Sequence, residues 1–377
     1  MLFNARFQYT HSIVSGLMTV EGARRLVDVL PLPPAGVLGL KQVARQKSSR
    51  ASVAIEGNPL NLQQAFKAIA GSDRSPSEHQ QEVRNYWRAL EWLEDWNSKK
   101  NIITEEFIKK LHSIIVVQTG GGRRREESQY RHVDCPVVDT ATGVIEYGPP
   151  EPKDVHKLMA DLVAWLNLKE VAALPGPIRA ALLAHRFVSI HPFNDGNGRT
   201  TRALATAELW RSGYYMQGFL SVEELYDERR NDYYDNLQMG LPWNFYDGRH
   251  DPDHTPWVEY FVSTLSEASE KIRIEAERLY QTQAKESAPW SELSRRQQQL
   301  LVRLTTRALD LGTSEATLTP GEIMEWFDVS KPTAHEWLKE WVAEGFVEPF
   351  NPGERTRYYI LASNWRAVVE EVKRHNA

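Results

Sequence analysis

The chain has 377 residues, of which 41% are hydrophobic and 25% are charged, and its formal net charge is -5 at pH 7. At about 150 residues per domain, this length predicts two or three domains, and the composition excludes disordered, collagen-like and low-complexity proteins. The acidic balance argues against a globally basic nucleic-acid binder but leaves room for a local basic patch.

Cysteine content and hydropathy predict the compartment. The single cysteine, Cys135, excludes an internal disulfide, and the sequence has no CxxC pair that would indicate a zinc site. The N-terminus lacks the basic and apolar segments of a secretory signal, and no stretch has the ~18 apolar residues of a membrane span. We therefore expect a soluble, cytoplasmic protein.

The N-terminal part of the chain is predicted to be helical. The segment LPLPPAG (residues 30–36) is too rich in proline for a helix interior, so we expect it to link an N-terminal arm to a helix near residues 37–56. Glu56 lies in the last turn of that helix, before Gly57, where the helix dipole disfavours a carboxylate. A second helix is expected over residues 78–96, where apolar side chains recur on one face: Val83, Trp87, Leu90 and Leu93.

Strand signals are scarce, and the clearest one follows another helical stripe at residues 104–115. Residues 133–148 contain two β-rich runs around the polar turn 140–143, which indicates a small hairpin. The glycine- and arginine-rich segment 120–129 is interpreted as a solvated loop, with phosphate binding as the lesser alternative. Helical stripes resume beyond the hairpin, at residues 153–166 and 255–272. The chain is therefore predicted to be mainly α with one inserted hairpin.

The most informative segment is IHPFNDGNGRTTRALATAELW (residues 190–210), a short turn between two predicted helices. Its glycine-rich centre, residues 196–198, allows backbone N–H groups to converge just before a helix N-terminus, which is a favourable place for an anion. Arg199 and Arg202 lie three positions apart on the following helix, so both could reach a polyphosphate. The segment is therefore predicted to bind phosphate groups.

Two further side chains in this segment suit attack on a nucleotide phosphate. Asp195 would repel bare phosphates, but a Mg²⁺ ion that bridges its carboxylate and the phosphate oxygens removes that conflict. His191, with an ordinary pKa of about 6.5, is largely neutral at pH 7 and can accept a proton. Taken singly, each of these short patterns is more often a turn, a packing contact or a solvated helix face. Their succession in one turn favours a nucleotide site.

The C-terminal part is predicted to form a separate module, with a boundary near residues 287–294. Thr319 is expected to cap a helix through a capping box with Glu322, and a second helix is expected from Ser330 to Gly345. An Asn-Pro-Gly turn between two extended runs then indicates a hairpin. This order of elements is typical of a winged helix-turn-helix.

The charge of this module weakens the case for DNA binding. Residues 287–377 contain 11 Lys and Arg against 13 Asp and Glu, whereas neutralisation of phosphates dominates DNA affinity. Arg355 and Arg357, on the expected wing, could still contact a DNA backbone, so DNA binding and protein docking or dimerisation both stay open. The tryptophans of the module are interpreted as its core: Trp326, Trp337 and Trp341.

At this point the sequence resembles a known family. HPFNDGNGRTTR matches the motif of the Fic family, His-x-Phe-x-Asp/Glu-Gly-Asn-Gly-Arg-x-x-Arg, at every defined position. The resemblance implies an α-helical Fic core that uses Mg²⁺ and transfers AMP from ATP to a hydroxyl of a target protein or of itself. His191 would take the proton from that hydroxyl, and Asp195 would hold the metal. The implied nucleotide-binding set is Phe193, which would also anchor the loop in the core, with Gly196, Asn197, Gly198, Arg199 and Arg202.

Two other segments fit the same resemblance. The hairpin at residues 132–147 looks like the flap of the family, which pairs with an extended target segment through main-chain hydrogen bonds; a structural cover over the core is an equally compatible interpretation. Tyr233 and Tyr234, in ERRNDYYDNL, would contact adenine, although two aromatic side chains on a helix are also typical of a core.

Ser-x-x-x-Glu-Gly at residues 52–57 resembles the inhibitory motif of Fic proteins. The resemblance implies that Glu56 pairs with Arg202 and spoils the γ-phosphate site, with Ser52 on the same face of the helix. Because this motif precedes the Fic motif in one chain, the chain resembles the intramolecularly inhibited class. The alternative is an exposed glutamate at a frayed helix end.

These features predict an N-terminal helical region at residues 1–98, a Fic catalytic domain at 99–286, and a small α+β winged helix-turn-helix domain at 287–377. The predicted function is autoinhibited AMP transfer to a protein hydroxyl. Two alternatives stay open: a winged-helix regulator whose Fic domain senses a nucleotide, and a phosphodiesterase that removes AMP with Glu56 positioning water. The sequence does not fix the target, the relieving signal or the oligomeric state, a homodimer included.

Overall fold

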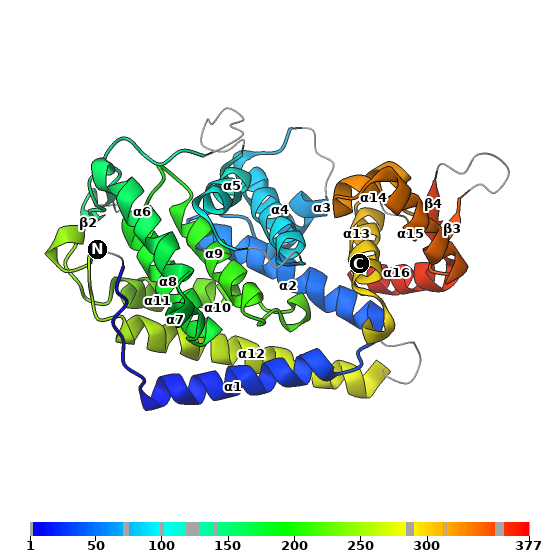
Figure 1. Cartoon of the computed structure of the whole chain (residues 1–377), viewed down its shortest axis with the longest axis horizontal. Coiled ribbons are helices and arrows are strands. Elements are labelled where there is room, and N and C mark those ends of the chain that lie inside the picture. The colour runs from blue at the N-terminus through cyan, green and yellow to red at the C-terminus, as the bar shows by residue number, and fades with distance from the viewer. Residues whose placement is uncertain are drawn as a thin grey trace. The chain divides into compact units, whose positions relative to one another are not determined.

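The structure is a computed structural model (Figure 1). It describes residues 3–70, 75–98, 102–117, 128–138, 142–283, 290–311, 313, 315–350 and 358–376. The chain divides into two compact units: residues 1–28, 44–69 and 73–274 form the first, and residues 29–43, 70–72 and 275–377 form the second. As predicted, the protein is mainly helical. Within the described ranges, no helix has both the length and the apolar character that crossing a membrane requires.

The first unit is an assembly of helices with one small hairpin. In chain order its helices are α1 (His11–Val29), α2 (Pro34–Ile55), α3 (Leu62–Ala70), α4 (Glu78–Ser98), α5 (Glu105–Val116), α6 (Pro152–Leu166), α7 (Lys169–Ala172), α8 (Gly176–Ile190), α9 (Asn197–Arg211), α10 (Glu223–Glu228), α11 (Arg230–Gln238) and α12 (Thr255–Gln283). Two 3₁₀ turns, Met216–Gly218 and Phe245–Asp247, join them. The ends of α1, α2, α3 and α12 include residues of the second unit.

The predicted elements of this unit are present, with one shifted boundary. The face of α4 predicted to be apolar is buried, and α5 begins at the cap residue Thr104, whose side chain accepts the N–H of Phe107. β1 (Val137–Val138) and β2 (Ile145–Tyr147) form the predicted hairpin, with Val137 opposite Tyr147. The prediction that residues 30–36 stop a helix was wrong at its end, because α2 begins at Pro34, and proline fits the first turn of a helix. Residues 120–127 and 139–141 of the predicted loops lie outside the described residues.

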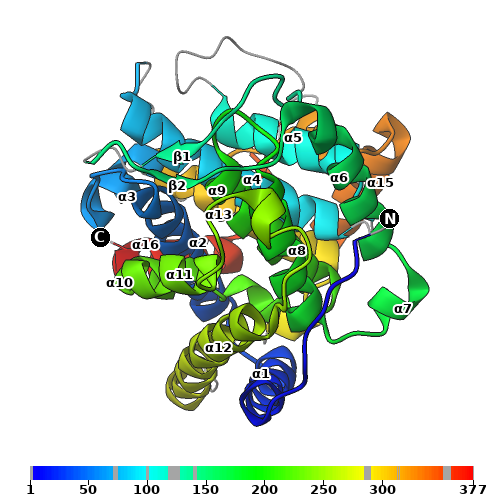
Figure 2. The same ribbon diagram turned by 90° about the vertical axis from the view of Figure 1, so that its left-hand side faces the viewer.

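Close packing of small residues brings two long helices together. α1 runs alongside α12 in both views (Figures 1 and 2). A Cβ atom at Gly16 of α1 would lie only 2.7 Å from Cγ1 of Val262 on α12. Glycine at this position therefore allows the two backbones to approach closely.

The centre of the first unit is the pair formed by α8 and α9. Both helices are buried along nearly their whole length. Arg179 of α8 donates to Oε1 of Glu208 on α9 at 2.7 Å, and to the carbonyls of Ala172 and Leu174 at 2.8 Å. The second oxygen of the fully buried Glu208 accepts from Arg211 at 2.8 Å. This network fixes the two helices at the ends remote from the turn that joins them.

The second unit contains the elements that the sequence predicts for a C-terminal module. They are α13 (Arg295–Leu311), α14 (Pro320–Phe327), α15 (Lys331–Ala343), β3 (Val347–Pro349), β4 (Tyr359–Leu361) and α16 (Ser363–Asn376), with a 3₁₀ turn at Trp290–Glu292. Thr319 and Glu322 form the predicted capping box, and Ser330 caps α15. β3 pairs with β4 in antiparallel orientation. The helix α16 was not predicted, and Arg355 and Arg357 lie outside the described residues.

The tryptophans of this unit do not share one environment. Trp341 is buried, as predicted for a core residue. Trp326 and Trp337 are only half-buried. The guanidinium groups of Arg307 and Arg296 lie over their rings, at 4.9 and 4.1 Å from the ring centroids. The prediction that all three tryptophans form the core was therefore too simple: arginine covers the outer faces of two of them.

Substitution Glu208→Ala should destabilise the first unit strongly. It leaves the buried guanidinium of Arg179 without its carboxylate, which typically costs about 3–5 kcal/mol in the free energy of unfolding. Urea denaturation followed by circular dichroism measures this loss. Glu170→Ala, an exposed carboxylate on α7, is the matched control and should change the free energy by less than about 0.5 kcal/mol. Equal midpoints for the two variants would contradict the structural role of Glu208.

Candidate functional site

The turn between α8 and α9 is built by two left-handed backbone conformations. His191 follows the last residue of α8 with φ 50° and ψ 58°, and its N–H donates to the carbonyl of Phe187 at 3.0 Å. Gly196 precedes the first residue of α9 with φ 73°. Because α9 already begins at Asn197, the open turn is shorter than the sequence predicts, and residues 197–199 form the first turn of the helix. The N–H groups of that turn have no acceptor within the helix.

Buried contacts fix the shape of this turn. The ring of Phe193 is buried and stacks on His112 of α5, with 3.7 Å between ring centroids. His112 donates from Nε2 to the carbonyl of Asp195 at 2.8 Å. The side chain of Asn197 accepts the N–H of Phe193 at 3.0 Å and donates to its carbonyl at 2.8 Å. Phe193 and Asn197 therefore hold the loop from within, as expected for Phe193, and neither lines the cavity described below. Their contact with a nucleotide stays a prediction.

Arg131 is the main donor to the carbonyl groups around this turn. It is 1% exposed, and its Nε donates to the carbonyl of His191 at 2.8 Å. Its terminal nitrogens donate to the carbonyls of Pro150 and Val133, which flank the hairpin. One buried cation thus ties the histidine turn to both ends of the hairpin.

His191 is held as a neutral imidazole. Burial lowers its pKa to about 4; the carbonyl of Val188 acts in the opposite direction, and the cation of Arg131 lowers the pKa further. Nδ1 lies 3.3 Å from the carbonyl of Val188. Since a carbonyl oxygen can only accept, Nδ1 carries the proton, and the lone pair of Nε2 is left to act as a base.

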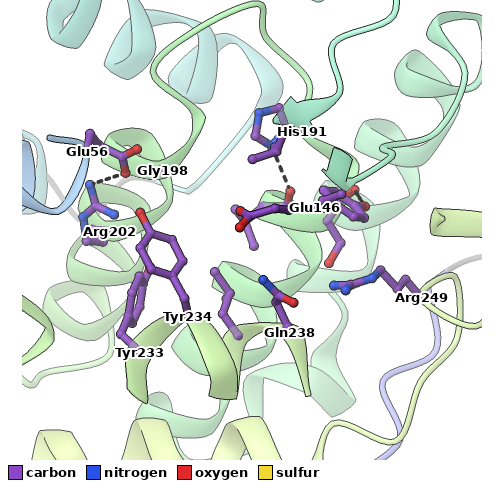
Figure 3. A pocket seen from close by; sticks show the side chains of 14 residues that line it. Glu56, Glu146, His191, Gly198, Arg202, Tyr233, Tyr234, Gln238 and Arg249 are labelled. Carbon is purple, nitrogen blue, oxygen red and sulfur yellow. Dashed lines mark hydrogen bonds and ion pairs between the residues drawn. The ribbon is translucent and has the colours of Figure 1, made fainter. Parts of the chain in front are cut away.

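His191 lines a cavity that also contains Arg202 and the start of α9 (Figure 3). The cavity encloses about 730 Å³ of empty space, including the part open to solvent. Its walls come from the end of α2, the hairpin, and helices α8, α9 and α11: Glu56, Val137, Glu146, Tyr147, Val188, Ser189, His191, Gly198, Arg202, Tyr233, Tyr234, Leu237, Gln238 and Arg249. Sequence reasoning missed Glu146, Gln238 and Arg249, which belong to no short motif.

Glu56 lies against the first turn of α9 and contacts Arg202. Its Oε1 accepts from Nη2 of Arg202 at 2.8 Å, and a Cβ atom at Gly198 would lie only 2.1 Å from that oxygen. Glycine at position 198 therefore leaves the space that the carboxylate fills. Ser52, one helical turn before Glu56, accepts from Nε of Arg202 through its hydroxyl at 2.9 Å and through its carbonyl from Nη2 at 2.7 Å. The predicted contact of Glu56 with Arg202 is therefore present, and Ser52, predicted to lie on the same face of the helix, contacts the same guanidinium.

Arg202 is a buried cation that needs anionic or carbonyl partners. It is 3% exposed. Burial by itself would lower its pKa, but the charge of Glu56 acts together with the nearby Tyr233, Tyr86 and Tyr234, and their combined effect raises the pKa above the ordinary value. In a low-dielectric environment, the cation is stabilised only while an anion occupies the adjacent space.

The two arginines of the motif do not face the same space. Arg199 is buried, and it donates to Glu82 of α4 at 2.9 Å and to both carboxylate oxygens of Asp195 at 3.2 Å. Arg199 does not line the cavity, whereas Arg202 does; that both bind one polyphosphate stays a prediction. Asp195 keeps a side chain that is 63% exposed at the mouth of the turn.

The exposed carboxylate at the turn between α8 and α9 that could bind a divalent cation is that of Asp195. No cluster of three or more His, Cys, Asp or Glu side chains suited to a metal occurs in the described part of the chain. Mg²⁺ usually binds through one or two carboxylates together with substrate phosphates and water, so the exposed Asp195 in the turn between α8 and α9 fits this mode.

The two tyrosines of α11 combine the alternatives predicted for them. Tyr233 is buried against Tyr226 and Trp257, yet its ring also lines the cavity. Tyr234 lines the cavity as well, and its hydroxyl donates to the carbonyl of Ile55 at 3.2 Å. The second tyrosine therefore also supports the end of α2 that carries Glu56.

Comparison with known proteins assigns the family of the central segment. Residues 102–209 match the family model described as "Fic/DOC family". The chain is 32% identical over 199 residues to the "Protein adenylyltransferase Fic" of Aedes aegypti, covering 50% of this chain and 35% of that protein. It is 31% identical over 251 residues to the protein of the same name from Culex quinquefasciatus, covering 62% and 46%. The chain thus spans less than half the length of these relatives.

The fold agrees with that assignment. A solved Fic family protein from Desulfovibrio desulfuricans G20 superposes with a TM-score of 0.58 and 24% identity, covering 96% of this chain and 99% of that chain. Together with the family match, this likeness in fold identifies residues 102–209 as a Fic domain.

Stability should fall when the pH is lowered through the ordinary histidine range. Burial lowers the pKa of His112, His191 and His254 to about 4 each, whereas the unfolded chain protonates near 6.5. Below about pH 6.5 the unfolded state binds protons that the folded state does not bind. Each histidine should therefore lower the free energy of unfolding by about 1.4 kcal/mol per pH unit, down to about pH 4. Above about pH 7 this contribution vanishes.

Urea midpoints at pH 7.5 and 5.5 measure this effect. We expect a clear drop at the lower pH, and His112→Gln should remove the share of one histidine from that drop. An unchanged midpoint in the wild-type chain would show that these rings are protonated in the folded state.

Proposed function

We propose that the chain, in which residues 102–209 form a Fic domain, transfers AMP from ATP to a hydroxyl group of a protein. One observation carries the proposal: the neutral His191, whose Nδ1 is bound to the carbonyl of Val188, lines the same cavity as Arg202 and the first turn of α9. A proton acceptor and an anion site therefore lie within reach of one nucleotide. The name of the relatives, protein adenylyltransferase, supports the same reaction.

The proposed reaction is a single displacement at the α-phosphorus. The hydroxyl oxygen of the target bonds to this phosphorus while the bond to the oxygen bridging the α and β phosphates breaks, and pyrophosphate leaves. Nε2 of His191 accepts the hydroxyl proton. Because the pKa of His191 is lowered, the imidazole is a weak base, and it takes the proton only as positive charge develops on the attacking oxygen. Val188, which binds Nδ1, keeps the ring in the tautomer that can accept this proton.

Binding of the nucleotide is assigned to backbone and side-chain donors of α9 and α11. The N–H groups of residues 197–199, at the helix N-terminus, would bind phosphate oxygens, and Arg202 would neutralise the terminal phosphate. Tyr233 and Tyr234 would contact adenine from α11. Asp195 would hold Mg²⁺, which when bound neutralises charge on the phosphates.

The contact between Glu56 and Arg202 is proposed to inhibit this reaction. The carboxylate fills the space beside Gly198 and uses the cation that the terminal phosphate would need. A phosphate and the carboxylate would repel each other at this distance, so the two compete for one buried guanidinium. Relief requires that the end of α2 move away.

Several polar contacts resist that movement. Arg45 of α2 forms an ion pair with Glu94 of α4, and Arg50 of α2 forms one with Asp227 of α10. Ser48 donates to the buried carboxylate of Glu223 at 2.9 Å. These contacts hold α2 against α4 and α10 and keep Glu56 next to Arg202.

The C-terminal module is proposed to be a winged helix-turn-helix that docks a protein or a second copy of the chain. Support comes from the order of its elements and from the absence of excess positive charge in residues 287–377. Its partner would be distinct from the nucleotide substrate. A cytoplasmic location is proposed from the single cysteine, because low cysteine content is typical of proteins in a reducing compartment.

Removing the glutamate should activate the enzyme, and removing the histidine should abolish it. Glu56→Gly frees Arg202 for the terminal phosphate, and we expect transfer to rise about 5- to 150-fold, the range of ordinary coupling energies. His191→Ala in that background should lower transfer by about 10²–10⁴-fold because the general base is lost. The measurement is retention of label on protein with Mg²⁺ and ATP labelled at the α-phosphate.

ATP labelled at the γ-phosphate is the chemical control, because nucleotidyl transfer retains only the α label. Glu170→Gly, the same change at an exposed glutamate of α7, is the control for the removal of a carboxylate. Equal rates for wild type and Glu56→Gly at saturating ATP would disprove inhibition, and retention of γ label would disprove AMP transfer.

A further inference from the structure

Exposed apolar side chains occur on the hairpin that contributes to the cavity wall and on a loop bonded to it. They come from the hairpin and from the loop after α11: Val138, Ile145, Trp243 and Tyr246, which are 39%, 46%, 53% and 48% exposed. We call these four residues, together with Glu146, the flap face. Glu146 and Val137 of the same hairpin line the cavity that contains His191. The flap face is therefore continuous with the candidate active site.

The backbone holds the two parts of this surface together. Gly148, next to β2, donates its N–H to the carbonyl of Trp243 at 2.8 Å and accepts the N–H of Phe245 at 2.9 Å. A Cβ atom at Gly148 would lie 2.7 Å from Cζ3 of Trp243, so glycine allows the indole ring to lie against the hairpin strand. The indole is thus fixed in position although half of its surface is exposed.

Tyr246 is fixed in a similar way. Its hydroxyl accepts the N–H of Glu151 at 2.9 Å and donates to the carboxylate of Asp154 at 2.5 Å. The ring is left exposed while its polar end is bound. Rigid, exposed aromatic side chains lose little entropy on binding, which suits them to anchor an apolar side chain of a partner.

The accessible charge on this surface is negative. Glu146 is exposed and lines the same cavity as His191 (Figure 3). Within the described part of the chain, its carboxylate forms no hydrogen bond or ion pair. Asp134 and Asp247, in the same segments, are exposed as well. The arginines of these segments do not offset this charge at the surface, because Arg131 and Arg249 are buried and donate to backbone carbonyls.

We propose that the flap face selects an extended target segment in which the accepting hydroxyl residue has a lysine or arginine beside it and an apolar residue further along. The basic side chain would pair with Glu146, and the apolar one would pack on Trp243 and Tyr246. The proposal rests on the function proposed above and specifies its substrate class. An extended segment fits because alternate side chains would point to the cavity and to the aromatic rings.

Peptides with a single threonine test the charge selection. The residue beside the threonine is lysine, alanine or glutamate, and transfer of α-labelled AMP is measured with Glu56→Gly. We expect the lysine peptide to be preferred over the glutamate peptide by about three- to tenfold, in keeping with a partly exposed ion pair. Adding Glu146→Lys should reverse that order. Adding Glu170→Lys, the same charge change on α7, should leave the order unchanged.

Binding measured without chemistry separates the two proposals. Fluorescence anisotropy of the same peptides with the Glu56→Gly, His191→Ala double variant should give the same order of affinity. Adding Trp243→Ala to this variant should lower the affinity for a peptide that has an apolar residue further along, and it should do so several-fold more than for a matched peptide without that residue. If the peptides bind in this order but accept no AMP from Glu56→Gly, AMP transfer fails and the surface stands. If the lysine and glutamate peptides bind equally, or if Glu146→Lys does not reverse the order, the selection by the flap face is overturned.

Discussion

A buried guanidinium cannot be left without an anion, and this constraint organises the site around Arg202. The cation lies at the N-terminal end of α9, where the helix dipole and unpaired N–H groups also favour negative charge. Glu56 satisfies both demands in the structure. Any nucleotide that binds there must supply a phosphate in its place, because two anions at that distance would repel each other strongly. In the proposed function, inhibition and substrate binding would thus be alternative ways to meet one electrostatic requirement.

The turn that carries His191 depends on a second buried cation. Carbonyl groups after the end of α8 are buried and need hydrogen-bond donors. Arg131 donates to the carbonyl of His191 and to the carbonyl of Pro150, beside the hairpin. Asn197 and His112 satisfy other backbone groups of the same turn. Several residues of the motif thus stabilise the loop, whereas the cavity is lined by His191, Gly198 and Arg202. This division gives a rigid base beside an anion site, as general-base catalysis requires.

In the proposed function, the hairpin would link nucleotide chemistry to the choice of target. Arg131 ties the hairpin to the histidine turn, so the strand that carries Glu146 lies at a fixed place beside His191. In the proposed function, an error in the docking of a target segment would displace its hydroxyl from Nε2. Positioning by a rigid strand and selection by charge at Glu146 would therefore act together.

The sequence by itself determined the local features of this protein. The apolar period of α4, the capping box at Thr319, the hairpin, the turn around His191 and the contact of Glu56 with Arg202 are all predictable, since each depends on short-range backbone preferences or on a specific motif. Only the tertiary structure decided which side chains face the cavity.

Tertiary packing turned Phe193, Asn197 and Arg199 away from the cavity and brought Glu146 and Arg249 to it from distant segments. Spacing along a helix or turn gives the direction of a side chain relative to its own element. It does not give which of the neighbouring elements will bury that side chain, because burial depends on contacts between residues far apart in the sequence.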